Sequence, residues 1–272
     1  MVKIFIIIFL FFISFESLVF AKETPQRIVS LGPVVTEEVY LLGAEDKLVA
    51  NTIYCTRPFT AKKKQKIGTV TRANIEKIVS LRPDLVTSIG LSNPKQMEKL
   101  KRLGINVVDF PTVKTFSQIC AHFLKLGRVL GKEEKANDII NYVVEKVDSI
   151  KKDTKNSKKL KVFIQIGAKP LVTINKDSFI NDIIDFAGGV NIAVNSKTGS
   201  YSREKVITSN PDVIFIASMG ILGEDEKNIW KKYKTINAVK NNRIYVLDAK
   251  NLCSLTPVSF VEILEEIRRY LD

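Results

Sequence analysis

Hydrophobic residues along this chain form short continuous runs and longer runs spaced three to four residues apart, as is typical of buried strands and amphipathic helices. The run Arg27–Leu31 predicts a buried strand that Pro33 interrupts, followed by a helix that begins at Thr36 and ends at Gly43. The alternation recurs in predicted helices over Asn74–Leu81 and Pro94–Leu103 and predicted strands over Asp84–Ile89 and Asn106–Asp109. Strands separated by helices predict parallel βα units, which bind ligands at the carboxyl ends of their strands.

The longest periodic segment begins at Lys132 and predicts one continuous helix to about Lys152, because it contains no Gly or Pro. A helix of roughly 20 residues is about 30 Å long, the width of a small domain. The charged stretch Lys151–Lys159 then marks a boundary. Beyond it, strands and helices resume at Leu160–Ile166, Phe179–Phe186, Glu204–Ser209, Asp212–Ala217, Arg243–Leu247 and Val258–Leu271.

The chain also contains an internal repeat. Residues 75–86 read IEKIVSLRPDLV and residues 203–214 read REKVITSNPDVI, with Glu, Lys, Pro and Asp identical at a constant offset of 128. Each block predicts a short helix begun by a capping residue (Asn74 or Ser202), a Pro-Asp turn and a buried strand. The repeat therefore predicts two lobes built alike, on either side of the long helix, with few hinges and a cleft between them.

The first residues predict the compartment. Lys3 precedes ten apolar residues, Ile4–Ile13, and small residues stand at Val19 and Ala21, which together indicate a secretory signal peptide over residues 1–21, cleaved after Ala21. The alternative is an uncleaved anchor, but the apolar run is shorter than the ~20 residues that span a bilayer. No cysteine lies near the cleavage position, so we expect a periplasmic protein without a lipid anchor.

Composition narrows the classes of function. The chain has 272 residues, 45% of them hydrophobic, as expected for a folded globular protein. Its 42 Lys and Arg against 29 Asp and Glu give a net charge of +13, which suits nucleic acid, an anionic surface or an anionic ligand. No arginine-rich run with interleaved aromatic residues occurs, so we expect no nucleic-acid partner.

The three cysteines are placed differently along the pattern. Cys120 lies on the apolar face of a predicted helix, which predicts a buried core thiol. Cys55 and Cys253 both follow predicted strands, and the sequence leaves open whether they form a disulfide or are two ordinary loop residues.

The repeated blocks and their flanking segments, among them RIVSLGPVVTEEVYLLGAEDKLVANTIYC, SREKVITSNPDVIFIA and IWKKYKTINAVKNNRIYVLD, resemble a known family. From about Arg27 to Tyr270 the chain is similar to the periplasmic binding proteins of ATP-binding-cassette (ABC) importers of cobalamin and ferric siderophores. The resemblance implies two Rossmann-like α/β lobes joined by a long rigid backbone helix, with the ligand cleft between them. The implied parts are the lobe 22–131, the helix 132–155 and the lobe 156–272.

The resemblance also implies a contact with the membrane. In this family an exposed glutamate on each lobe docks onto arginines of the permease, and the matching positions here are Glu76 and Glu204. The alternative for each is an acid in the first turn of a helix that stabilises the helix dipole by ~0.3–1 kcal/mol without any partner.

Candidate ligand contacts follow from the cleft loops. Tyr54 matches an aromatic residue that cobalamin binders place in the cleft, although aliphatic residues stand where other aromatic residues of that pocket would be. Arg57 and Arg72 suit anionic chelates such as a ferric siderophore, because a guanidinium binds carboxylates and catecholates in bidentate fashion; the alternative is a solvated loop charge. Tyr201 and Met219 are further candidates, whereas Trp230 is predicted to lie in the core.

Other classes of function fit these residues less well. The single histidine, His122, lies beside the apolar face of a helix, where it serves neither a metal site nor a hydrolase. We therefore expect no enzyme and no cofactor, but a monomeric binding protein for a metal chelate: a ferric siderophore, cobalamin, a related corrinoid or haem. The alternatives are an adaptor or sensor of the same fold without a transport role, and a chelatase-like enzyme.

Overall fold

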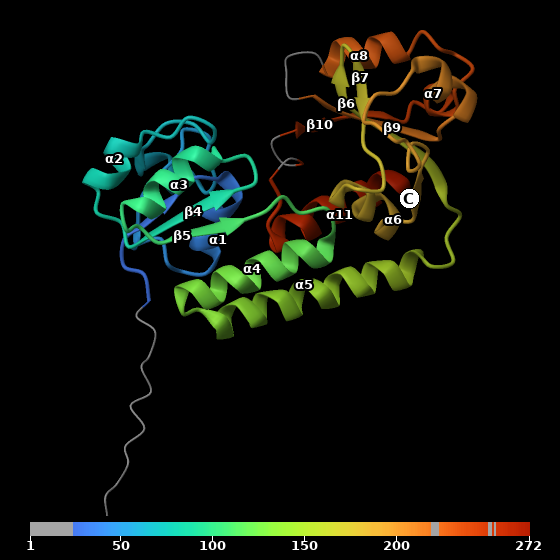
Figure 1. The fold of residues 1–272 in the computed structure, drawn as a ribbon. Helices are drawn as coiled ribbons and strands as arrows, with labels where there is room; N and C mark the ends of the chain where they lie inside the picture. Colours follow the sequence, from blue (N-terminus) through green and yellow to red (C-terminus); the bar gives the residue numbers. More distant parts are fainter. Residues whose placement is uncertain (1–23, 219–222, 250–251, 253) are drawn as a thin grey trace, which may run out of the picture.

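The computed structural model describes residues 24–218, 223–249, 252 and 254–272. It contains two α/β domains, with the helices α4 (Phe116–Leu130) and α5 (Glu133–Thr154) running beneath both (Figure 1). The predicted signal peptide, the candidate ligand contact Met219 and Cys253 lie outside the described residues. Within the described part, no helix has both the length and the apolar character that crossing a membrane requires.

The N-terminal domain is a parallel five-stranded sheet in the order β3-β2-β1-β4-β5. Its strands are β1 (Ile28–Ser30), β2 (Leu48–Asn51), β3 (Gln65–Lys66), β4 (Leu85–Ile89) and β5 (Val107–Phe110). Its helices are α1 (Pro33–Leu41), the short 3-10 helix η1 (Phe59–Lys63), α2 (Ile75–Ser80) and α3 (Pro94–Arg102).

The C-terminal domain has a second sheet in the order β10-β9-β6-β7, with β8 also paired to β6. Its strands are β6 (Leu160–Ala168), β7 (Leu171–Thr173), β8 (Gly189–Asn191), β9 (Val213–Ser218) and β10 (Ile244–Asp248). Its helices are α6 (Phe179–Phe186), α7 (Arg203–Ser209), α8 (Gly223–Trp230), α9 (Asn237–Lys240) and α11 (Pro257–Leu271). Among the strand pairs described for this sheet, β6–β7 is antiparallel and the others are parallel.

The repeat in the sequence corresponds to a repeat in structure. The parallel pairings β2-β1-β4-β5 of the first sheet match the pairings β8-β6-β9-β10 of the second. In each repeat the residue two positions before the aspartate has a left-handed backbone, with φ of 46° at Arg82 and 48° at Asn210. The aspartates then accept backbone N–H groups at the start of the neighbouring strand: Asp84 from Arg27 (3.0 Å) and Asp212 from Lys161 (2.9 Å). The two-lobe α/β architecture is confirmed.

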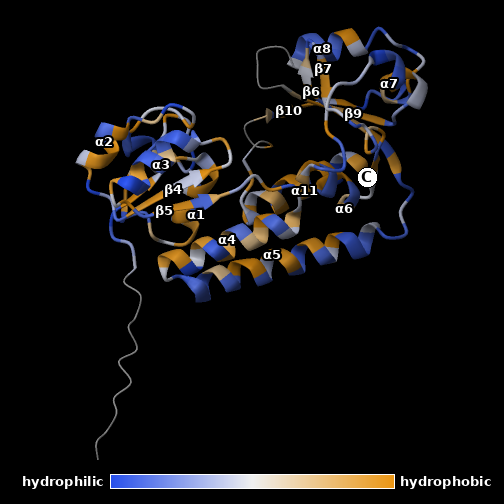
Figure 2. Cartoon of the chain, in the orientation of Figure 1, coloured by the Kyte–Doolittle hydropathy of each residue, from blue (hydrophilic) through white to orange (hydrophobic). Residues whose placement is uncertain are grey.

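The predicted long helix is also confirmed, as the 22-residue α5, about 33 Å in length. One face of it is buried, and Figure 2 shows hydrophobic and hydrophilic residues alternating along it. It packs against α4, where a Cβ at Gly127 would stand 2.5 Å from the Cβ of Ala136, so the missing side chain allows the close approach. Asp182 of α6 accepts a hydrogen bond from the Phe116 amide (2.8 Å), which ties the start of α4 to the C-terminal domain.

One predicted helix boundary was wrong. Helix α1 begins at Pro33, not at Thr36, with Gly32 as its N-cap residue. Proline has no N–H and a fixed φ, so it suits the first position of a helix, where an N–H would have no partner within the helix. Pro33 therefore starts the helix as well as ending the strand, and the Thr36 side chain points inward to the Ser30 hydroxyl (2.9 Å).

Both sheets are covered on their two faces. One large hydrophobic cluster fills the space between the sheets and α4, α5 and α11, and a smaller cluster covers the other face of each sheet. Cys120 lies in the large cluster, as predicted, and burial raises the pKa of its thiol to about 12. Trp230 lies fully buried in the cluster of the C-terminal domain, which confirms its prediction as a core residue.

Candidate functional site

The carboxyl ends of the two sheets are directed toward each other. In Figure 1 the arrow of β5 points toward the C-terminal domain and that of β10 toward the N-terminal domain. Parallel sheets bind ligands at this edge. We call the loops 52–64 and 90–93, which follow β2 and β4 at this edge, the N-terminal rim.

Large apolar side chains are exposed along the N-terminal rim. Tyr54 is 56% exposed, Phe59 70% and Leu91 68%, and Ile53 beside Tyr54 is 49% exposed. A group of exposed apolar side chains at the carboxyl edge of a sheet is typical of a surface that a ligand covers. The sequence indicated Tyr54 among these residues but not Ile53, Phe59 or Leu91, because a single apolar residue in a loop does not indicate its exposure.

A half-buried lysine holds the first rim loop in shape. Lys66 of β3 donates through its ammonium to Asn51 Oδ1 (2.6 Å) and to the carbonyls of Ala61 (3.1 Å) and Cys55 (3.4 Å). Desolvation lowers the pKa of Lys66. The ammonium thus joins both ends of the loop that carries Tyr54 and Phe59, so the loop is organised before any ligand arrives.

Cys55 provides a second anchor for this loop. It is fully buried and carries a free thiol, with the hydroxyls of Thr36 and Thr52 each 3.2 Å from its sulfur. These contacts fasten the rim loop to the first turn of α1.

Arg57 joins the two domains. Its guanidinium lies 3.0 Å from the Glu37 carboxylate of α1 and donates to the Ser254 carbonyl, which precedes α11, at 2.8 Å. It also lines a pocket of about 420 Å³ with polar residues of α11 that include Glu262 and Glu266. Burial, with the nearby charge of Glu262, raises the pKa of Glu37 against the opposing effect of Arg57.

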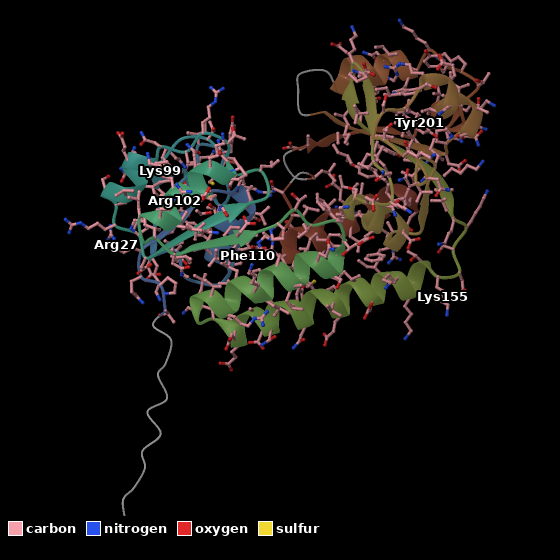
Figure 3. All side chains as sticks on the ribbon, in the orientation of Figure 1. Arg27, Lys99, Arg102, Phe110, Lys155 and Tyr201 are labelled. Atoms are coloured by element: carbon pink, nitrogen blue, oxygen red, sulfur yellow. The ribbon has the colours of Figure 1, made fainter. Side chains whose placement is uncertain are left out.

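The other candidate ligand contacts are placed apart from one another. Arg72 is exposed in the turn between β3 and α2, where its amide bonds to the Thr69 hydroxyl (3.0 Å). Tyr201 lies within the C-terminal domain (Figure 3), its ring 5.8 Å from that of Phe163 and its hydroxyl 3.4 Å from the Ile192 carbonyl. Tyr54 and Arg57 share one loop, whereas Tyr201 packs against the core of the other domain.

Glu76 and Glu204 occupy equivalent exposed positions, each the second residue of its short helix, α2 or α7. The N-cap side chains Asn74 and Ser202 accept from the amides of Lys77 (2.9 Å) and Lys205 (3.2 Å). Hydrogen bonds from its own amide and from Ser202 lower the pKa of Glu204. Figure 1 places α2 and α7 on opposite outer sides of the molecule, away from α5.

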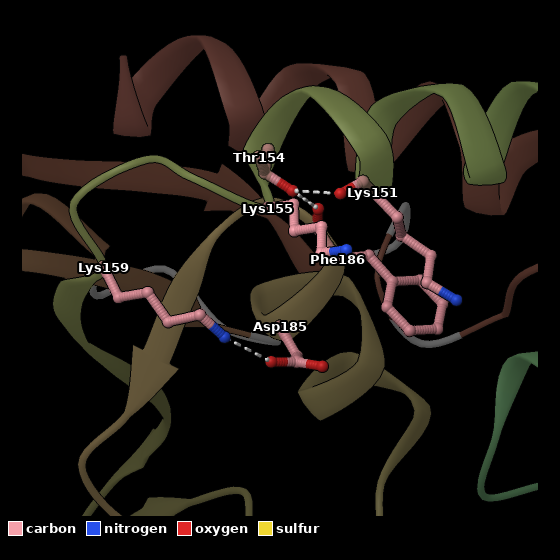
Figure 4. Close-up of a pocket in the computed structure, with 6 residues that line it drawn as sticks. All are labelled: Lys151, Thr154, Lys155, Lys159, Asp185 and Phe186. Carbon is pink, nitrogen blue, oxygen red and sulfur yellow. Dashed lines mark hydrogen bonds and ion pairs between the residues drawn. The ribbon is translucent and has the colours of Figure 1, made fainter.

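A second pocket lies at the far end of α5, away from the rim (Figures 3 and 4). It measures about 200 Å³ and is lined by Lys151, Thr154, Lys155, Lys159, Asp185 and Phe186. Lys159 is 3.4 Å from Asp185, and Lys151 lies over the Phe186 ring. In the part of the chain that the structure describes, no three His, Cys, Asp or Glu side chains form a group that could hold a metal ion.

Comparison with known proteins agrees with this architecture. A model of the family described as "Periplasmic binding protein" matches residues 28–251. The "Vitamin B12-binding protein" of Vibrio parahaemolyticus is 29% identical over 255 residues, which cover 92% of this chain and 91% of that protein. The "Uncharacterized ABC transporter substrate-binding lipoprotein YvrC" of Bacillus subtilis is 31% identical over 261 residues, covering 90% of this chain and 80% of that protein.

A solved structure supports the same fold. The crystal structure of a possible iron-binding (periplasmic solute-binding) protein from Staphylococcus epidermidis superposes with a TM-score of 0.82 at 28% identity, over 92% of this chain and 99% of that chain.

Proposed function

The chain belongs to the periplasmic binding protein family, and from this premise we propose that it captures a metal chelate and delivers it to an ABC importer. The observation that carries the proposal is the N-terminal rim, where Tyr54, Phe59 and Leu91 expose apolar surface at the carboxyl edge of the first sheet. Corrinoids, haem and ferric siderophores share the matching chemistry of a large rigid body with apolar surface, and haem, corrinoids and ferric catecholates also carry anionic groups. The relatives named for vitamin B12 and for iron support this class of ligand.

Within the rim we propose distinct roles for the candidate residues. Tyr54 of the rim stacks on the ligand, and Arg72, exposed outside the rim in the turn between β3 and α2, attracts its anionic groups. Arg57 already contacts Glu37 and Ser254, so we assign it to fixing the rim loop against the C-terminal domain rather than to charge recognition alone. The relatives are binding proteins, and no turnover of the chelate is part of the proposal.

We propose that Glu76 and Glu204 dock onto the permease. Each carboxylate is exposed, and the two lie on separate domains. A partner with two matching cationic sites therefore binds both acids only when the distance between the domains fits. Charge-assisted carboxylate–guanidinium bonds are directional and about twice as strong as neutral hydrogen bonds. We further propose that the mature protein is a monomer, free in the periplasm after cleavage following Ala21. One relative is named a lipoprotein, so the absence of a lipid anchor needs a test of its own. The intact mass of the exported protein gives this test, because it shows both the cleavage position and any attached lipid.

Calorimetry with cyanocobalamin, haem, a ferric catecholate and a ferric hydroxamate tests the choice of ligand. We expect one class to bind. Tyr54→Ala should then weaken that binding about two- to thirteenfold, because an aromatic contact contributes ~0.5–1.5 kcal/mol.

Tyr142→Ala is the matched control. Tyr142 is exposed to the same 56% but lies on α5, away from the rim. Binding of none of the four chelates, or equal losses in the two variants, would contradict the proposal.

A further inference from the structure

We call the carboxyl edge of each sheet, which is directed toward the other domain, the interdomain edge. Each proposed docking helix is bonded to the helix that follows a strand ending at this edge. In the N-terminal domain, α3 follows β4 through the rim loop that exposes Leu91, and α3 packs beside α2. In the C-terminal domain, α8 is the next helix after β9, and its side chains reach α7. The internal repeat makes α2 equivalent to α7, and the sheet pairings make β4 equivalent to β9, so the same two connections exist in both domains.

In the N-terminal domain the connection is made by one glutamine. Gln96 of α3 accepts from the amide of Ala73 (3.2 Å) and donates to the carbonyl of the same residue (2.8 Å). Ala73 directly precedes Asn74, the N-cap residue of α2, and also forms an antiparallel bridge with Gly68. The backbone three residues before Glu76 is therefore fixed on both its donor and its acceptor.

In the C-terminal domain the connection is an ion pair between a half-buried arginine and a buried glutamate. Glu226 of α8, 4% exposed, bonds to the guanidinium of Arg203 at 2.5 Å, and Arg203 directly precedes Glu204. The same carboxylate oxygen accepts from Gln165 of β6 (2.9 Å), whose own carbonyl accepts from the indole of Trp230 (2.7 Å). The guanidinium also lies 4.7 Å over the Trp230 ring, so Arg203 is held from two sides.

We propose that Gln96 and the Arg203–Glu226 pair are positioning residues that set the two docking acids relative to the interdomain edge. This inference rests on the proposed docking function of Glu76 and Glu204. Helices as short as α2 and α7, with six and seven residues, have no stability of their own, so tertiary bonds decide where their side chains stand. Any displacement of α3 or α8 when a ligand fills the cleft is passed through these bonds to the acid.

Docking to membranes tests the inference without knowledge of the ligand. Right-side-out membrane vesicles from the cells that make the protein, deleted for its own gene, are titrated with the purified full chain. The double variant Gln96→Ala/Glu226→Gln should raise the dissociation constant for the vesicles about tenfold. The matched control Gln118→Ala/Glu224→Gln should leave it unchanged. The Gln118 side chain accepts from the Lys114 amide just before α4, away from both docking helices, and Glu224 is exposed on α8.

The variant Val143→Ala distinguishes a general loss of stability from a loss of the positioning role. Val143 is fully buried on α5, far in sequence from both docking helices, so this variant lowers the melting temperature and should leave docking unchanged. Docking by Gln96→Ala/Glu226→Gln equal to that of the wild type, or weakened no more than in Val143→Ala, overturns the inference. If the buried Glu226→Gln change prevents folding, Gln96→Ala alone carries the test.

The docking function itself has a separate arm in the same titration. Glu76→Ala/Glu204→Ala should abolish saturable binding to the vesicles. If that variant binds like the wild type, or if the wild type does not bind, the proposed docking fails. If only the Gln96→Ala/Glu226→Gln arm behaves like the wild type, docking stands and the positioning role falls.

Discussion

His122 and Glu38 lie together in the interior where α4 meets α1. Their Nε2 and Oε2 atoms are 3.3 Å apart, Glu38 is fully buried, and the imidazole stacks on Phe110 at 4.5 Å. Burial raises the pKa of Glu38 well above its usual value and, together with the charge of Lys125, lowers the pKa of His122 to about 4. Both effects favour the uncharged pair, with the proton on the carboxyl.

This pair predicts a specific pH dependence of stability. A histidine whose pKa falls from 6.5 to about 4 on folding binds fewer protons in the folded state between these values. The contribution of His122 to the free energy of unfolding is fully present above pH 6.5. It is lost as the pH falls toward 4, and the loss is at most about 3 kcal/mol. Urea unfolding from pH 7 to 4 should therefore show a steeper loss of stability in the wild type than in His122→Gln.

The variant isolates the histidine because Glu38, whose raised pKa acts in the opposite direction as the pH rises, is present in both proteins. Parallel pH curves for the two proteins would show that His122 is protonated in the folded state and would refute this account.

At the scale of elements, the repeated Pro-Asp turn performs the same task in both domains. Asp84 accepts the amides of Gln26 (2.7 Å) and Arg27, just before β1. Asp212 accepts the amide of Lys161 in β6 and the side-chain amide of Asn237 (3.0 Å). In both domains, therefore, the carboxylate of the repeated Pro-Asp turn joins the start of the strand that follows it to the start of the neighbouring parallel strand.

Asp84→Ala and Asp212→Ala should each lower the free energy of unfolding by about 1–2 kcal/mol, because each leaves backbone or amide donors without a charged acceptor. Asp138→Ala, an exposed acid on α5, is the control and should change it by less than about 0.5 kcal/mol. Circular dichroism during urea unfolding measures all three. A loss confined to one domain's aspartate would show that the two turns are not equivalent in energy.

At the scale of the whole molecule, the proposed docking depends on the distance between the two domains. The helix α5 and the Arg57 contacts with Glu37 and Ser254 connect the domains, so the separation of Glu76 and Glu204 depends on how the domains sit around the ligand. Under the proposed docking function, a permease that binds both acids is sensitive to this separation.

Glu76→Ala/Glu204→Ala should abolish uptake of the bound chelate by cells, while calorimetry shows an unchanged dissociation constant for it. Glu134→Ala/Glu145→Ala removes two exposed acids from α5 and should leave uptake intact. Uptake that survives in the first variant would count against the assignment of these acids, whereas a weakened chelate affinity would place them at the ligand instead.

Much of the fold was predictable because its causes are local. The apolar periodicity of α5 and the repeated blocks around Asp84 and Asp212 are visible in the sequence, and the structure bears them out. The candidate site was predictable only as far as Tyr54 marks one rim loop. Lys66, which holds that loop, looks in the sequence like any other lysine of a basic chain, since its role depends on carbonyls that folding brings around it.

The sequence alone thus determined two similar halves, a long helix between them, and matching acids at Glu76 and Glu204, because spacing and repetition depend only on the order of residues. The tertiary structure decided which polar groups meet across the chain. Arg57 bonds to Ser254, 197 positions away, and Glu226 bonds to Arg203 across two separate helices. Such contacts leave no local pattern, because they are fixed by how the elements pack.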